Sequence, residues 1–148
     1  PPSMMMASWM GSDFTNDDIV KDASYRDDFN SRVVGRTEDP RGWEIEMVAR
    51  EGAVGLWKRI LFVVSPDGKL PLRSSYYDRR GRLARVMVFD RVKQFGTRRV
   101  PARMVLTPMD DGGKPRRDQR TELEYLNIEF NADVPESTFS LSRLERQR

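Results

Sequence analysis

Turn-forming residues recur at short intervals along this chain, and this spacing constrains the fold more than any other feature. The clearest turns are Asp39-Pro40-Arg41-Gly42, Ser65-Pro66-Asp67-Gly68 and Asp110-Asp111-Gly112-Gly113. Between the turns lie β-rich runs at 29–36, 43–50, 57–65, 72–78, 83–94, 100–107 and 120–130. Because short runs separated by turns are typical of consecutive hairpins, the sequence predicts an antiparallel meander of about seven strands.

Alternation inside the runs indicates which side of each strand faces the core. In the run 43–50, Trp43 and Ile45 share one face while Glu44 and Glu46 share the other. Side chains alternate between the two faces of a strand, so this strand should be apolar on one face and solvated on the other. The run 57–64 is apolar at both sets of alternate positions, which favours an interior strand covered on both faces.

Helical signals are confined to two short stretches, at 14–20 and 135–139. In the first stretch a possible cap residue precedes Asp17 and Asp18, which favours their assignment as acids of a helical first turn. A twisted sheet with one apolar face must close into a barrel or be covered by helices or by a ligand. The sequence therefore predicts a mainly β (α+β) fold with one or two short helices.

Residue types that the chain lacks exclude much chemistry. It has 148 residues, enough for one packed domain, and contains no cysteine and no histidine. Thiolate nucleophiles, disulfides, imidazole bases and the usual zinc sites are therefore excluded. The sequence also lacks a Gly-rich phosphate loop and a Gly-x-Ser-x-Gly motif. We expect no catalytic residues, no metal and no cofactor.

Two acid pairs have the spacing that places both carboxylates on one strand face. Glu44 pairs in this way with Glu46, and Glu122 with Glu124. Paired carboxylates can perform general acid-base catalysis, but cross-strand arginines or lysines neutralise such pairs on a solvated face. The solvated face is the preferred interpretation, and it agrees with a protein that is not an enzyme.

A series of short motifs, in order along the chain, resembles the LolA-like family of outer-membrane lipoprotein-sorting proteins. The motifs are Met10-Gly11-Ser12-Asp13-Phe14-Thr15-Asn16-Asp17-Asp18, Trp43-Glu44-Ile45-Glu46, Lys69-Leu70-Pro71-Leu72, Tyr76-Tyr77-Asp78-Arg79-Arg80-Gly81-Arg82-Leu83, Val100-Pro101-Ala102-Arg103-Met104 and Phe139-Ser140-Leu141-Ser142-Arg143-Leu144-Glu145. The resemblance implies a bent antiparallel sheet that forms an incomplete, half β-barrel. It further implies that acyl chains are held on the apolar concave face.

The resemblance also implies a domain organisation. Residues 1–9 are expected to form an N-terminal tail or truncation edge, and 10–148 a single LolA-like domain that corresponds to the C-terminal part of the family fold. No signal peptide is recognised in the chain. Large uncovered apolar patches are normally binding or association sites, so the missing N-terminal half predicts a possible homodimer through the face it would have covered.

Acyl-chain binding requires an apolar lining with flexible residues among it, and Met47, Met87 and Met104 could supply the flexibility. Each lining residue, taken alone, is also consistent with ordinary core packing. The predicted lipid-binding residues are Trp43, Ile45, Met47, Ile60, Phe62, Val64, Leu72, Tyr76, Val86, Val88, Met104 and Leu106.

The resemblance implies a periplasmic carrier that takes a lipoprotein or another acyl-chain lipid toward the outer membrane, with an inner-membrane transporter as a possible partner. One alternative is an accessory protein that senses lipid or lipoprotein for an envelope transporter or a stress-response system. Another is a nucleic-acid-binding β-sheet module that uses arginine-rich hairpins. Interspersed acids and the lack of an RNA-binding aromatic pattern argue against nucleic acid as a partner. A basic rim for headgroups or a partner is predicted at Arg79, Arg80, Arg82, Arg98 and Arg99.

Overall fold

The structure, a computed structural model, describes residues 4, 6–20 and 25–139. Within these residues seven strands form one antiparallel sheet, in which each strand pairs only with its neighbours along the chain. The strands are β1 (Phe29–Glu38), β2 (Arg41–Ala49), β3 (Trp57–Val64), β4 (Pro71–Asp78), β5 (Leu83–Phe95), β6 (Arg98–Pro108) and β7 (Thr121–Glu124). The predicted seven-stranded meander is therefore confirmed.

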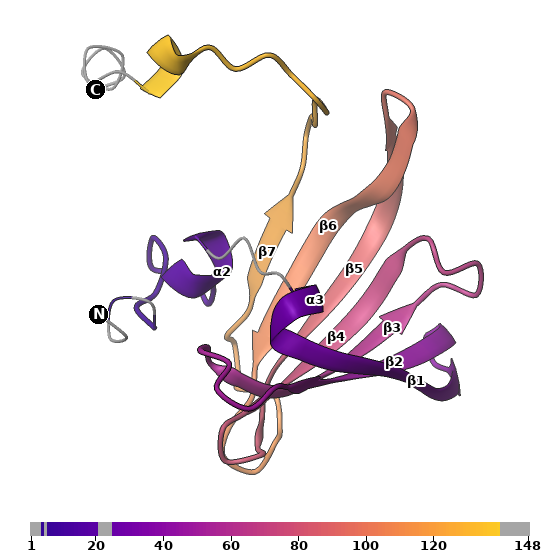
Figure 1. Cartoon of the computed structure of the whole chain (residues 1–148), viewed down its shortest axis with the longest axis vertical. Coiled ribbons are helices and arrows are strands. Elements are labelled where there is room, and N and C mark those ends of the chain that lie inside the picture. Colours follow the sequence, from indigo (N-terminus) through magenta and orange to yellow (C-terminus); the bar gives the residue numbers. More distant parts are fainter. Residues whose placement is uncertain (1–3, 5, 21–24, 140–148) are drawn as a thin grey trace.

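The sheet curves strongly but does not close, because its edge strands β1 and β7 do not pair with each other. Figure 1 shows β1 and β2 running across the direction of β5 and β6, so that the sheet wraps around a concave face. Such curvature follows from the right-handed twist that accumulates from strand to strand. The predicted mainly β half-barrel is confirmed.

The last strand is shorter than predicted. β7 ends at Glu124, whereas the β-rich run extends to residue 130. One further backbone hydrogen bond joins the Tyr125 N–H to the Ala102 carbonyl at 2.7 Å. At this level of the sheet Arg91 of β5 has a positive φ of 52°, which interrupts regular strand geometry. The pairing of β7 stops where β5 and β6 leave the sheet as a two-stranded arm (Figure 1).

The described helices are short. They are α2 (Asn16–Val20), α3 (Tyr25–Asp28) and the 3-10 helix η1 (Glu136–Phe139), of which α3 was not predicted. Thr15 caps α2 because its hydroxyl accepts a hydrogen bond from the Asp18 N–H, while the Asp18 carboxylate accepts one from the Thr15 N–H at 2.8 Å. This reciprocal arrangement is a capping box, and it confirms the short helix predicted at 14–20.

The segment before α2 folds back on itself and joins the sheet. The Trp9 N–H donates to the Phe14 carbonyl at 2.7 Å, and the Asn16 N–H donates to the Ala7 carbonyl at 3.0 Å. The Asp13 N–H donates to the Thr121 hydroxyl of β7 at 2.9 Å. Ala7 and Trp9, from the predicted tail 1–9, therefore hydrogen-bond to residues of the predicted domain. The motif residues 140–145 lie outside the described residues.

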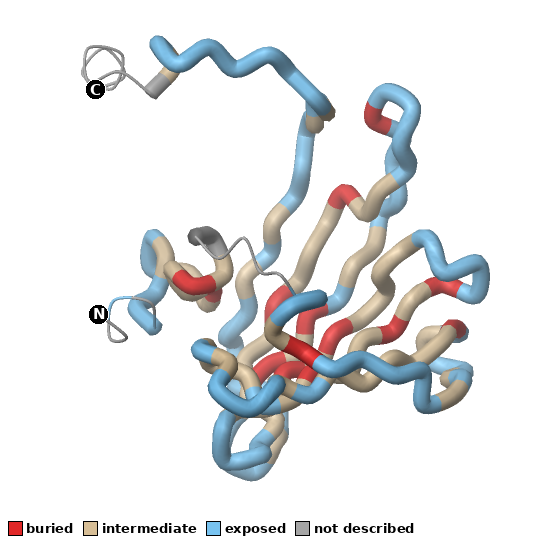
Figure 2. The backbone as a smooth tube through the Cα atoms, viewed as in Figure 1, coloured by how far each residue is buried: buried red, intermediate tan, exposed pale blue. Residues whose placement is uncertain are grey.

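The interior position predicted for the strand 57–64 is confirmed. β3 lies between β2 and β4, and its side chains are buried on both faces. Ile60 has 1% of its surface exposed on the concave face, and Val63 has 1% exposed on the convex face. Figure 2 shows that many buried residues gather where the sheet curves around its centre, while most of β1 and of the arm is exposed. Phe95 in the arm is an exception, with 7% of its surface exposed.

Candidate functional site

The strand register brings most of the predicted lipid-binding residues onto one face. Met47 of β2 pairs with Ile60 of β3, which pairs with Tyr76 of β4. Directly opposed residues of neighbouring strands share a face, and residues two apart along one strand share it too. By this register the concave face carries Trp43, Ile45, Met47, Ile60, Phe62, Val64, Tyr76, Met104 and Leu106.

Val86 and Val88 are the predicted lining residues that the structure separates from the rest. Both lie on the convex face, because Met87 between them pairs with Ser74 and Leu106, which are concave. The run Ala84 to Phe89 is largely apolar at both sets of alternate positions, so spacing alone could not choose its face. Met87 and Phe89 occupy the concave positions instead. Leu72 falls at a register irregularity between β3 and β4, where it has no paired residue.

One half of the concave face is covered by the N-terminal segment, residues 6–18. Phe14 from this segment joins the buried cluster of Phe29, Ile60, Tyr76, Met87 and Leu106, and Trp9 packs against the same cluster. The members of this cluster have at most 6% of their surface exposed. We name this half, defined by these cluster residues, the covered half.

An ion pair fastens the N-terminal segment to the sheet. Arg85 of β5 donates two parallel hydrogen bonds to the Asp18 carboxylate, from Nη1 to Oδ2 at 2.7 Å and from Nη2 to Oδ1 at 2.6 Å. The Arg85 side chain is 6% exposed and that of Asp18 is 15% exposed. A bidentate pair with so little solvent contact has both the geometry and the low-dielectric setting that make ion pairs strong.

The charge on Asp18 is stabilised by its partners. Burial alone would raise the pKa of this carboxyl group, but the hydrogen bonds and positive charge of Arg85, with the hydrogen bonds from Thr15, outweigh burial and lower the pKa. Asp18 therefore stays ionised near neutral pH while it serves two roles. It completes the cap of α2 and it anchors α2 to the sheet.

Two aromatic rings enclose the Arg85 guanidinium. Its central carbon lies 4.4 Å from the ring centre of Trp57 and 4.4 Å from that of Tyr76. A cation over an aromatic face is favourable, more so when it is desolvated. The Arg85 Nε is buried without a hydrogen-bond partner. In the sequence Arg85 is the one charged residue of the run Ala84 to Phe89, but the local pattern does not indicate its partner Asp18.

The other half of the concave face is less covered. Trp43, Ile45, Phe62, Val64 and Phe89 are partly exposed, although they lie on the same face as the covered half. Phe62 and Phe89 meet edge to face with their ring centres 6.4 Å apart. We name this set of five residues the open half. It is a strip of partly exposed apolar side chains on the concave surface. The Arg36 guanidinium lies 4.3 Å from the Trp43 ring centre at one end of the strip, and Phe89 also packs against the core cluster.

The predicted basic rim divides between the two ends of the sheet. In a meander, successive hairpins turn at opposite ends. Arg79, Arg80 and Arg82 therefore lie at one end, in the β4–β5 connection, while Arg98 and Arg99 begin β6 at the other. The structure does not bring the five arginines together.

The acid pairs lie on the convex face, where Glu46, Glu122 and Glu124 contact cations. Glu46 contacts Arg32 at 2.6 Å and Arg59 at 3.4 Å. Glu122 contacts Arg120 at 3.1 Å, and Lys93 lies 3.4 Å from Glu124. Hydrogen bonding from Arg32 lowers the pKa of Glu46, so its carboxylate is held in the ionised form. Glu122 also lies 3.6 Å from Arg103 of β6, so each of these three carboxylates contacts a cation from another strand.

Among the described residues, no group of three or more acidic side chains forms a candidate metal site. No helix within the described ranges combines the length and apolar character needed to cross a bilayer. The concave face, whose open half has partly exposed apolar side chains, is the candidate functional site.

A protein-family model described as "-like: Uncharacterized protein" matches residues 1–146. The chain belongs to that family. A search of curated proteins finds no match.

Three solved structures share the fold. A DUF1329 family protein from Desulfovibrio piger gives a TM-score of 0.77 at 23% identity, over 96% of this chain and 57% of that one. An outer membrane lipoprotein-sorting domain from Vibrio parahaemolyticus gives 0.74 at 18% identity, over 99% of this chain and 60% of that one. A LolA superfamily protein from Nitrosomonas europaea gives 0.68 at 15% identity, over 93% of this chain and 60% of that one.

These likenesses confirm the LolA-like fold predicted from the sequence motifs. The chain spans about three fifths of the length of each similar structure, as their coverage of 57% to 60% shows. At such low identities the shared feature is the architecture, a curved sheet of the kind found in lipoprotein-sorting proteins. Function must be argued from the site itself.

Proposed function

We propose that this protein is a non-catalytic carrier that holds acyl chains of a lipoprotein or another lipid on the open half of its concave face. The observation that carries this proposal is the row of partly exposed apolar side chains on a curved sheet. Trp43, Ile45, Phe62, Val64 and Phe89 offer no charge to a ligand. An acyl chain, which has no hydrogen-bonding groups, matches such a lining.

The energetics favour a long apolar ligand. Each CH₂ group removed from water contributes about 0.8 kcal/mol, so a chain of several methylenes can offset the cost of association. Met47 and Met104 lie beside the open half and pack partly against the core cluster. Their unbranched side chains can adapt to acyl chains of different shape.

The compartment and partners are part of the same proposal. The similar structure from Vibrio parahaemolyticus is described as an outer membrane lipoprotein-sorting domain. By analogy we place this protein in the periplasm, with an inner-membrane transporter as the source of its lipid. A homodimer formed through the open half would compete with lipid binding, because a second copy of the chain would cover the same surface.

Native mass spectrometry of the protein purified without detergent, followed by denaturing extraction, tests the proposal. The expected result is a co-purified acyl lipid, or stoichiometric uptake of an added fatty acid or lipopeptide. A monomer that binds none of these ligands, or a dimer that excludes them, would contradict the carrier function.

A matched pair of variants locates the binding face. Ile45→Glu places a charge on the open half, and it should weaken fatty-acid binding at least about tenfold, equivalent to about 1.4 kcal/mol. Val88→Glu places the same charge on the convex face, where Val88 is already 39% exposed, and should leave binding within about twofold. Equal effects of the two substitutions would show that the open half is not the site.

A further inference from the structure

Charge is unevenly distributed between the two ends of the sheet. The connections 50–56, 79–82 and 109–120 meet at one end, which we name the basic end. There the turn 79–82 has three arginines and no acid, and the loop 109–120 has four basic and three acidic residues. The connections at the opposite end, 39–40, 65–70 and 96–97, have two acids and one lysine. Excess positive charge in the connections therefore lies at the basic end.

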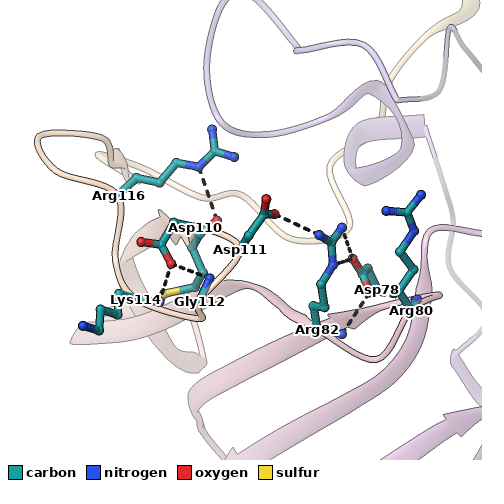
Figure 3. A network of polar contacts seen from close by, with 9 residues as sticks. Asp78, Arg80, Arg82, Asp110, Asp111, Gly112, Lys114 and Arg116 are labelled. Atoms are coloured by element: carbon teal, nitrogen blue, oxygen red, sulfur yellow. Dashed lines mark hydrogen bonds and ion pairs between the residues drawn. The ribbon is translucent and has the colours of Figure 1, made fainter.

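Internal bonds order the loops of the basic end. The Asp110 carboxylate accepts hydrogen bonds from the N–H groups of Gly112 and Lys114, at 2.9 Å each. Arg82 links the turn 79–82 to the loop 109–120, because it contacts Asp78 at 3.0 Å and Asp111 at 2.9 Å (Figure 3). The loops are thus held together as one surface.

Several cationic side chains of this surface form no ion pair with the acids that order the loops. No acidic partner for the side chains of Arg80, Lys114 or Arg117 occurs within the described ranges. Figure 3 shows the side chains of Arg80 and Lys114 directed away from the network that holds Arg82. These charges are available to an external anion.

The basic end also presents an exposed apolar side chain. Arg79 donates hydrogen bonds to the carbonyls of Ala53, at 2.7 Å, and Gly55, at 2.9 Å. These carbonyls flank Val54, which is 85% exposed. Arg79 therefore fixes the backbone on both sides of the valine and holds it beside the cationic turn. Cations next to a protruding apolar residue are typical of a surface that binds a bilayer. The cations contact the anionic headgroups, and the apolar side chain inserts toward the acyl chains.

We propose that the basic end docks onto bilayers rich in anionic phospholipid. The cations are spread over two connections and are not gathered into a pocket, which suits a dense field of mobile headgroups. Each lysine or arginine near such a surface strengthens binding about fivefold, the equivalent of about 1 kcal/mol. The attraction falls with ionic strength, because salt screens exposed charges.

Co-sedimentation of the chain with vesicles of phosphatidylglycerol and phosphatidylethanolamine tests this proposal. The double variant Arg80→Ala/Arg117→Ala should bind about 25-fold more weakly than the wild type at low salt. The control Arg41→Ala/Arg99→Ala removes the same charge from two exposed arginines at the opposite end, and should change binding less than about threefold. Wild-type binding should also weaken steeply with salt, and be lost on phosphatidylcholine vesicles.

Three results would overturn the proposal: no binding to the anionic vesicles, equal losses in the two double variants, or tighter binding to a single-stranded oligonucleotide than to the vesicles. Equal losses would mean that only total charge matters. Docking at the basic end does not require an occupied concave face, so this proposal and the carrier proposal fail separately.

Discussion

The covered and open halves of the concave face have the same kinds of residue but different environments. Ile60 and Ile45 lie on neighbouring strands and on the same face, yet Ile60 is 1% exposed and Ile45 is partly exposed. This difference in exposure follows from which part of the chain packs over each residue. The N-terminal segment, fastened by Asp18, reaches the covered half and leaves the open half to solvent. Coverage by a distant segment, more than residue type, decides which apolar positions form the core.

The largest expected effect on stability comes from breaking the ion pair between Asp18 and Arg85. Asp18→Asn deletes the negative charge and leaves Arg85 buried without a counter-charge, so unfolding should become easier by about 3 to 5 kcal/mol. Urea denaturation at neutral pH measures this change. The same substitution at the exposed Asp111, which pairs with Arg82, should cost less than about 0.5 kcal/mol. If Asp18→Asn cost no more than this control, the ion pair would not hold the covered half together.

The two isoleucines give the next largest contrast. Ile60→Ala leaves a cavity in the covered half, and it should destabilise the protein by about 2 to 4 kcal/mol. Ile45→Ala removes the same atoms from a partly exposed site, and should cost about 1 kcal/mol or less. Thermal or urea unfolding of the two variants measures both values. Equal costs would mean that the open half is packed as tightly as the covered half.

Acid should produce the smallest and most gradual effect. Because Arg85 lowers the folded-state pKa of Asp18, the ion pair contributes full stability above the unfolded-state pKa, about 3.9. This contribution is lost as the pH falls through the lowered folded-state pKa. The stability difference between wild type and Asp18→Asn should therefore be constant above about pH 5 and should shrink below about pH 4. A difference that did not change over this range would show that Asp18 does not titrate with folding.

The sheet could be predicted almost completely from the sequence, because turn residues and strand residues alternate at regular spacing. Each strand pairs with its neighbour along the chain, so no long-range information was needed to order them. The end of β7 could not be predicted, because the β-rich run continues to residue 130 although the strand stops at Glu124.

The site was predicted less completely, and for physical reasons. Val86 and Val88 were predicted on the concave face, but Met87 and Phe89 lie there instead. The run Ala84 to Phe89 is largely apolar at both sets of alternate positions, and an error of one residue assigns every side chain to the opposite face. Asp18 was recognised as a helix acid, but its partner Arg85 lies 67 positions away. Local patterns explain a cap, whereas an ion pair between distant segments appears only once the chain is folded.

The meander and its N-terminal segment differ in how far apart along the chain their contacts lie. Hairpins close short loops, whereas Asp18 meets Arg85 over 67 positions and Asp13 meets Thr121 over 108. Closing a longer loop costs more entropy, so we expect the hairpins to form first and the N-terminal segment to attach late in folding. In that order of events, the folding chain passes through a state in which the N-terminal segment does not yet cover any part of the concave face.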